Sequence, residues 1–197
     1  MTQDRTRAAR NGLRAELVHV FSEMAERPGD EHPIPVGRAL AEAVGYPKDL
    51  LDSLPSDSVD AFAGVTYIWG FAEIPLQGTI LDLGCGAGLD LLIAARRAER
   101  VIGIDFSKSM LARARKAADL SAAGNVEAVL GDAERIPLED ASVDSALVNG
   151  IFNLNPARAV IFGELARVIR AGGRAFVAEL ILTDGAVPST QQSDWFS

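Results

Sequence analysis

Three glycines at alternate positions form the part of this chain most suited to binding a ligand. Gly84, Gly86 and Gly88 directly follow the apolar run Thr79–Leu83, and a helical pattern begins at Leu89. Because glycine has no Cβ, a turn of this composition lets a ligand approach the backbone closely. The spacing is G-x-G-x-G, which differs from the G-x-G-x-x-G turn that holds a dinucleotide pyrophosphate. We therefore expect a ligand that needs close backbone approach more than a phosphate cradle.

Two carboxylates follow the next two apolar runs. Asp105 ends the run that starts at Val101, about 20 residues after the first glycine, where a doubly wound fold places its ribose-binding acid. A carboxylate there can accept hydrogen bonds from both ribose hydroxyls. Asp132 follows Gly131 after a third apolar run. Residue type alone leaves two alternatives open: Asp105 as a helix cap before Ser107, and Asp132 as a turn residue.

The elements that must position these residues alternate between strand and helix patterns. The predicted strands span 79–83, 101–104, 126–130, 142–149 and 175–182, and the predicted helices span 89–98, 107–122 and a segment after Pro156. A turn is expected at Arg170–Arg174. Such alternation implies an α/β fold with a doubly wound, mostly parallel sheet. Right-handed crossovers and a switch point give the strand order 3-2-1-4-5.

A helical cap is expected before the first strand. Apolar residues recur at helical spacing from Arg5 to Glu26, and a shorter helix is expected over Val36–Val44 with Gly45 at its end. The apolar and aromatic segment Ala61–Ile74 is expected to cover the ligand, in a form that the pattern does not define. We expect a boundary near Gly78, with an N-terminal cap over 1–78 and an α/β core over 79–197.

These motifs, in this order, resemble class I methyltransferases, which use S-adenosylmethionine. The resemblance covers about Thr79–Leu182 and includes Leu165–Gly173. It implies that Asp105 binds the ribose, and that Asp132 and the next backbone N–H bind the adenine. The cofactor-binding residues expected on this basis are Asp82, Gly84, Cys85, Gly86, Gly88, Asp105, Phe106, Met110, Asp132, Ala133 and Asn149.

Several shorter segments resemble arsenite methyltransferases, a family that holds As(III) with cysteine thiolates. They include Val44–Tyr46 and Phe152–Leu154. Where that family places cysteines, this chain has Ala63-Gly64-Val65 and Gly150. Cys85, the single cysteine, is expected to be a small packing residue. The resemblance therefore implies a relative with a different methyl acceptor, since soft trivalent arsenic needs sulfur ligands.

The proposed reaction is an in-line transfer of the methyl group to a small molecule. The cofactor carries the difficult chemistry, so neither a catalytic triad nor a metal site is required, and no metal is expected. Asn149, at the end of the fourth strand, and Tyr67 are candidates for contact with the reactants. A strand-end cap and a core aromatic are their structural alternatives. Glu179 is expected inside the fifth strand, facing either the acceptor pocket or an arginine.

Composition limits the partners. The chain has 197 residues, a net charge of −8 and no basic cluster beyond short helix faces, so nucleic-acid binding is disfavoured. A polar N-terminus, the absence of a long apolar run and the single cysteine favour a cytoplasmic protein without membrane segments. Because only Thr183–Ser197 follow the fifth strand, we expect either a homodimer that covers the sheet edge or a longer parent chain.

Three other functions compete with a small-molecule methyltransferase. One is a protein or RNA methyltransferase, although no basic groove is visible in the sequence. A nicotinamide-dependent oxidoreductase is disfavoured by the glycine spacing and by the Gly131-Asp132 pair. A non-catalytic protein that binds the cofactor, or a scaffold, is compatible with the missing cysteines.

Overall fold

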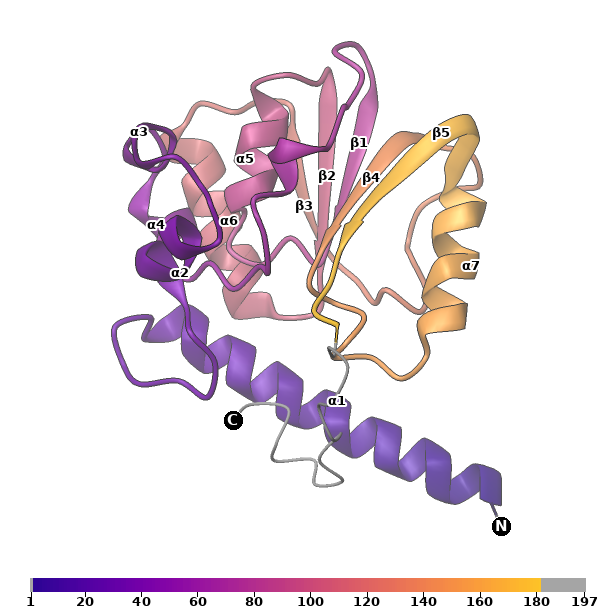
Figure 1. Ribbon diagram of the computed structural model, residues 1–197. Helices are drawn as coiled ribbons and strands as arrows, with labels where there is room; N and C mark the ends of the chain where they lie inside the picture. Colours follow the sequence, from indigo (N-terminus) through magenta and orange to yellow (C-terminus); the bar gives the residue numbers. More distant parts are fainter. Residues whose placement is uncertain (1, 182–197) are drawn as a thin grey trace.

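A five-stranded parallel sheet forms the centre of the computed structural model, which describes residues 2–181, with side chains described from residue 12 onward (Figure 1). The strand order is β3-β2-β1-β4-β5, which confirms the predicted order. The strands are β1 (Thr79–Leu83), β2 (Arg100–Asp105), β3 (Val126–Leu130), β4 (Val143–Asn149) and β5 (Ile169–Ala178). The chain reverses its winding between β1 and β4, so a crevice is expected at their carboxyl ends.

Helices cover both faces of the sheet because alternate strand residues point to opposite sides. On one face, Ile80, Val101 and Leu147 pack with the apolar sides of α5 (Leu89–Ala95) and α6 (Lys108–Leu120). On the other face, Leu81 and Val148 pack with α7 (Arg158–Val168). The predicted first core helix is shorter than expected, because residues 96–98 form a closing turn after Ala95.

The N-terminal part is helical, as predicted, and its buried side chains belong to the same hydrophobic core as those of the sheet. Four helices precede the sheet: α1 (Thr2–Glu26), α2 (Gly37–Ala43), α3 (Lys48–Asp52) and α4 (Ser56–Val59). Gly45 follows α2 with a positive φ of 101°, which favours glycine at this helix end. The segment 61–74 contains a single 3₁₀ turn, η1 (Ile68–Gly70). Figure 1 shows α1 below the sheet, at the end where β4 and β5 finish.

The fifth strand differs from its prediction. It begins at Ile169 and keeps the expected turn residues, Arg170–Arg174, inside the strand, where the register with β4 shifts between Val143 and Ser145. Gly172 has a positive φ of 84°, and the Arg170 guanidinium pairs with Asp144 at 2.6 Å. The segment Arg170–Arg174 thus forms an irregular part of the strand and not a separate turn.

The end of this strand corrects a second expectation. β5 finishes at Ala178, so Glu179 lies outside it. The Glu179 carboxylate accepts hydrogen bonds from the backbone N–H groups of Phe152 and Asn153 and pairs with no arginine among the described side chains. The expectation for residues 183–197 lies outside the described residues. The homodimer stays a prediction, which sedimentation at several protein concentrations would test.

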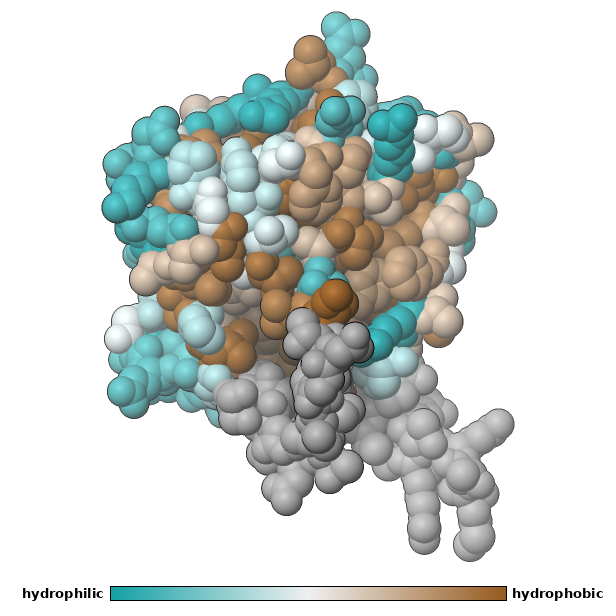
Figure 2. All heavy atoms as spheres, viewed as in Figure 1, coloured by the Kyte–Doolittle hydropathy of each residue, from teal (hydrophilic) through white to brown (hydrophobic). Residues whose placement is uncertain are grey.

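Apolar surface accompanies this edge of the sheet. Figure 2 shows apolar side chains gathered over β4 and β5, and Leu180 and Ile181 are among the exposed large apolar residues.

Among residues 2–181, no helix combines the length and the apolar character needed to cross a membrane.

Candidate functional site

The three glycines of the turn after β1 serve different purposes. All have positive φ angles: 78° at Gly84, 51° at Gly86 and 88° at Gly88. A Cβ on Gly84 would lie 2.4 Å from the Ile151 side chain, whereas a Cβ on Gly86 would have no neighbour within 4 Å. Gly86 therefore presents bare backbone to open space in the pocket, which is the geometry that close ligand approach requires.

Asp105 is held in place by backbone donors. One carboxylate oxygen accepts from the Gly86 N–H at 2.9 Å, and the other accepts from the Ser107 N–H at 2.8 Å. Ser107 also caps α6 by accepting from the Met110 N–H at 3.3 Å. Burial raises the pKa of Asp105 to about 6, against the opposing effect of these backbone donors. Each oxygen keeps accepting capacity, so a ligand hydroxyl can still bind here.

Asp82 contributes a buried acceptor without a partner. Its side chain lies in the middle of the sheet at β1, and its Oδ2 atom has no hydrogen-bond partner among the described residues. Burial raises the pKa of Asp82 well above its usual range, and the negative charges of Asp90 and Asp105 add to the effect. A buried carboxylate oxygen without a partner is costly, so this site favours a ligand that brings a donor or a positive charge.

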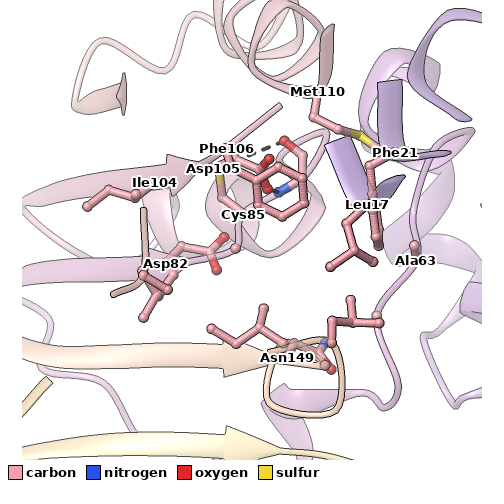
Figure 3. A pocket seen from close by; sticks show the side chains of 18 of the residues that line it. Leu17, Phe21, Ala63, Asp82, Cys85, Ile104, Asp105, Phe106, Met110 and Asn149 are labelled. Carbon is pink, nitrogen blue, oxygen red and sulfur yellow. Dashed lines mark hydrogen bonds between the residues drawn. The ribbon is translucent and has the colours of Figure 1, made fainter. Parts of the chain in front are cut away.

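Helix α1 forms a wall that the sequence analysis did not assign to the site. Leu13, Leu17 and Phe21 line the pocket, and the Phe21 ring meets the Phe106 ring edge-on at 5.8 Å. Figure 3 shows Leu17 and Phe21 across the pocket from Asp82. Their helical spacing predicts an amphipathic helix, and nothing in that pattern distinguishes a face that packs on the core from a pocket wall.

The same helix contacts the acid at the end of β3. The Arg14 guanidinium forms an ion pair with Asp132 Oδ2, while Asp132 Oδ1 accepts from the Glu134 N–H at 3.0 Å. Arg14 is half-exposed, with 53% of its side chain accessible. Asp132 thus lies at the carboxyl end of the sheet, as expected, and is ion-paired with Arg14 of the N-terminal cap.

Most of the predicted site residues lie around one pocket. Its lining includes Asp82, Gly84, Cys85, Gly86, Asp105, Phe106, Met110, Asp132, Ala133 and Asn149. Gly88 and Tyr67 are outside this lining: a Cβ on Gly88 would lie 3.0 Å from Ala114, and the Tyr67 ring packs edge-on against Tyr46 at 5.0 Å. Residues Ala61–Gly64 of the apolar segment also line the pocket.

Cys85 lies in a packed environment. It is buried, and a Cβ on Gly103 of β2 would lie 2.8 Å from its sulfur. Burial and the nearby carboxylates of Asp105 and Asp82 raise the pKa of the thiol well above its usual range. A thiol in this state is a poor nucleophile and a poor metal ligand.

The two positions compared with thiolate ligands lie together. A Cβ on Gly150 would lie 2.8 Å from a methyl group of Val65, so the Val65 side chain occupies the space beside Gly150. Among the side chains described, those of residues 12–181, no group of three or more His, Cys, Asp or Glu could hold a metal ion.

A buried polar cluster in the pocket wall was missed by the sequence analysis. Asp90 Oδ1 accepts from the Tyr46 hydroxyl at 2.6 Å and from the Trp69 indole N–H at 2.8 Å, and Asp90 Oδ2 accepts from the Asn149 amide at 3.0 Å. The position of Asp90, four residues after Gly86, was the only available signal, because its partners come from distant segments.

The fold and the site together define a Rossmann-like α/β domain with a nucleoside-type pocket at the carboxyl ends of its strands. A family of methyltransferase domains matches residues 77–195, more than half of the chain. The chain belongs to this family of methyltransferase domains.

Individual relatives agree with this assignment. The chain is 34% identical over 146 residues to an arsenite methyltransferase of Halobacterium salinarum, covering 73% of this chain and 37% of that protein. It is 35% identical over 123 residues to a demethylmenaquinone methyltransferase of Beutenbergia cavernae, covering 59% of this chain and 48% of that protein. The chain thus spans less than half the length of these two relatives.

Solved structures show the same fold. The YcgJ protein of Bacillus subtilis superposes with a TM-score of 0.53 at 29% identity, covering 56% of this chain and 47% of that chain. A candidate S-adenosylmethionine-dependent methyltransferase from Methanococcus maripaludis gives a TM-score of 0.51 at 28% identity, covering 54% and 49%.

Proposed function

We propose that this chain is an S-adenosylmethionine-binding methyltransferase that acts on a small molecule. The observation that carries the proposal is the convergence of the bare Gly86 backbone, the oriented Asp105 carboxylate and the unpartnered Asp82 oxygen on one pocket. The family assignment and the relatives named above support it.

The residues present fit such a cofactor. Asp105 would accept from the ribose hydroxyls, Asp82 would accept from the amino group of the methionine part, and Asp132 with the Ala133 N–H would meet the adenine. Three buried acidic side chains, Asp82, Asp90 and Asp105, line the pocket. A ligand that carries a sulfonium and an ammonium group suits such a lining better than an anionic dinucleotide does.

When bound, the cofactor supplies an electrophilic methyl group on a sulfonium. The chain's contribution is to orient the reactants and to exclude water. Leu17 and Phe21 of α1 cover the pocket opposite Asp82, and the cap segment Ala61–Gly64 forms an adjoining wall. Holding two reactants in register contributes about 7–11 kcal/mol to lowering a barrier. We accordingly propose 1–78 as a cap that completes the pocket of the 79–197 core.

The acceptor that best suits this wall is an apolar molecule without negative charge. The side chains Leu13, Phe62, Ile151 and Leu154 are apolar, and the acidic side chains that line the pocket outnumber its single described cation, Arg14. An anionic acceptor would be repelled. The methyl-lined contact of Val65 with Gly150 offers no soft ligand for arsenic.

A non-catalytic cofactor-binding protein or scaffold is the second candidate. The Val65–Gly150 contact favours it, because the space used for thiolates in the arsenite-methylating relatives is filled. Sustained cofactor binding without methyl transfer to a broad panel of apolar acceptors would support this candidate.

Calorimetric titration tests the proposal directly. The purified chain is titrated with S-adenosylmethionine, S-adenosylhomocysteine and NAD. Binding of both adenosyl ligands and none of NAD is the expected result. A folded chain that binds neither adenosyl ligand would overturn the proposal.

A further inference from the structure

Asn149 lies at the end of β4, and both the oxygen and the nitrogen of its side-chain amide are hydrogen-bonded within the protein. Its Oδ1 atom accepts from the Val65 N–H at 3.0 Å and from the Thr66 N–H at 3.3 Å. Its Nδ2 atom lies 3.0 Å from the Thr66 carbonyl, 3.0 Å from Asp90 Oδ2 and 3.3 Å from the Tyr46 hydroxyl. An amide oxygen has two acceptor sites and an amide nitrogen two donors, so none remains for a ligand.

The surrounding groups fix which way this amide points. Two backbone N–H donors face Oδ1, while a carboxylate and a carbonyl face Nδ2. A flipped amide would bring oxygen against the Asp90 carboxylate and nitrogen against two N–H groups. Asp90 is itself held by Tyr46 and Trp69, so the cluster has a single satisfied arrangement.

Asn149 fixes the position of one wall of the pocket. Ala63 and Gly64, which directly precede its two backbone partners, line the pocket, as do Gly150 and Ile151 on its own strand end. A Cβ on Gly64 would lie 2.7 Å from Asn149 Nδ2, so the backbone passes directly over the amide. The amide is therefore the junction between the cap segment and the carboxyl end of β4.

We propose that Asn149 is a positioning residue, whose amide fastens the segment 63–66 onto β4 and so shapes the pocket wall. Its contribution to ligand binding then passes through this segment, and its amide oxygen and nitrogen make no hydrogen bond to the cofactor or the reacting groups. The consequence for binding rests on the proposed function, whereas the fastening itself is a property of the fold.

Replacing Asn149 by aspartate, N149D, tests the fastening with almost no change of shape. The new carboxylate keeps an acceptor for Val65 and Thr66 but places a second oxygen against Asp90 Oδ2 and the Thr66 carbonyl. The titratable groups in contact with this position are Asp90 of α5 and the Tyr46 hydroxyl, and Asp82 of β1 acts electrostatically on both of them. Two carboxylates this close share a proton, and that proton restores a donor at acidic pH.

The expected results combine ligand affinity with hydrogen exchange. At pH 8, N149D should bind S-adenosylhomocysteine about tenfold or more weakly than the unchanged chain. Its amides at 63–66 should exchange faster. Between pH 8 and pH 5.5, both differences from the unchanged chain should shrink. Asn149→Ala should show both defects at every pH. N149D at pH 5.5 keeps the test available if the alanine variant fails to fold.

Asn125→Asp is the matched control. The Asn125 amide donates to the Ala95 and Ala98 carbonyls at 2.9 and 3.0 Å, and Asn125 is not part of the pocket lining. This variant should leave ligand affinity and exchange at 63–66 unchanged.

Two results would overturn the inference. The first is unchanged exchange at 63–66 in both Asn149 variants. The second is an affinity loss that is independent of pH while these amides stay protected, which would indicate direct ligand contact. If the unchanged chain binds no adenosyl ligand, the proposed function fails, and the exchange measurement still decides the role of Asn149.

Discussion

Asp105 is the residue on which the proposed ribose contact depends. Asp105→Ala removes both carboxylate oxygens and should weaken binding of S-adenosylhomocysteine by about 1.5–3 kcal/mol, because two hydrogen bonds to a charged group are lost. Calorimetric titration measures this change. Asp119→Ala, at an exposed position of α6, is the control and should bind normally. Equal affinities of the unchanged chain and Asp105→Ala would mean that Asp105 serves only to accept the Gly86 and Ser107 N–H groups.

Asp82 shows how a residue can serve binding at the expense of stability. Its buried carboxylate has an oxygen without a partner among the described residues, and burial raises its pKa. Asp82→Asn removes the cost of burying an ionisable carboxyl group and should raise the unfolding free energy of the ligand-free chain by about 1 kcal/mol, or roughly 2–4 °C in Tm. The Tm increase caused by S-adenosylhomocysteine should shrink. A lower Tm without ligand, or an undiminished ligand effect, would contradict this account.

Several individual contacts of the site could not have been read from residue types. The glycine turn and the acids after β2 and β3 follow a local spacing, so the sequence predicted Gly86, Asp105 and Asp132 at the carboxyl end of the sheet. Tyr46 and Trp69 reach Asp90 from segments 44 and 21 residues away, and no local pattern encodes such a pairing.

At the scale of elements, α1 is both a packing helix and a wall of the site. Its Arg14 pairs with Asp132, the acid proposed to meet the adenine. Arg14→Gln should strengthen binding of S-adenosylhomocysteine by up to about fivefold. The Arg14–Asp132 ion pair is largely exposed and worth about 0.2–1 kcal/mol, and without it the ligand no longer competes with Arg14 for Asp132. Titration measures the effect, with Arg27→Gln as control because Arg27 pairs with Glu23 instead. Weaker binding in Arg14→Gln would show that the guanidinium assists the ligand.

The strands and helices differ in how well their sequences predicted them. β1 and β3 match their predicted bounds, because period-two and continuous apolar patterns end at glycine or polar residues. β5 does not, because Arg170–Arg174 has the composition of a turn while Arg170 is held against Asp144 of β4. A tertiary ion pair and a register shift keep these residues in the strand, and neither is visible in a local window.

For the whole molecule, the acidic pocket couples ligand binding to pH. The pKa of Asp105 is raised to about 6 in the folded chain, above the ordinary value of 3.8 for an exposed aspartate, so the folded state binds more protons between these values. Its contribution to stability is therefore complete below about pH 4 and declines as pH rises through about 6. A ribose hydroxyl donates to the ionised form, so ligand binding should strengthen over the same interval.

The stabilisation by S-adenosylhomocysteine should consequently grow between pH 5 and pH 7.5. Thermal unfolding with and without ligand across this range measures it, because a ligand that binds only the folded state raises Tm according to its affinity. Asp105→Asn, which cannot ionise, should show a flatter dependence, with the remaining slope arising from Asp82 and Asp90, whose pKa values burial also raises. A ligand effect that is constant with pH in the unchanged chain would mean that the bound ligand does not distinguish the carboxylate from the carboxylic acid. The contact at Asp105 would then be one that does not require an ionised acceptor.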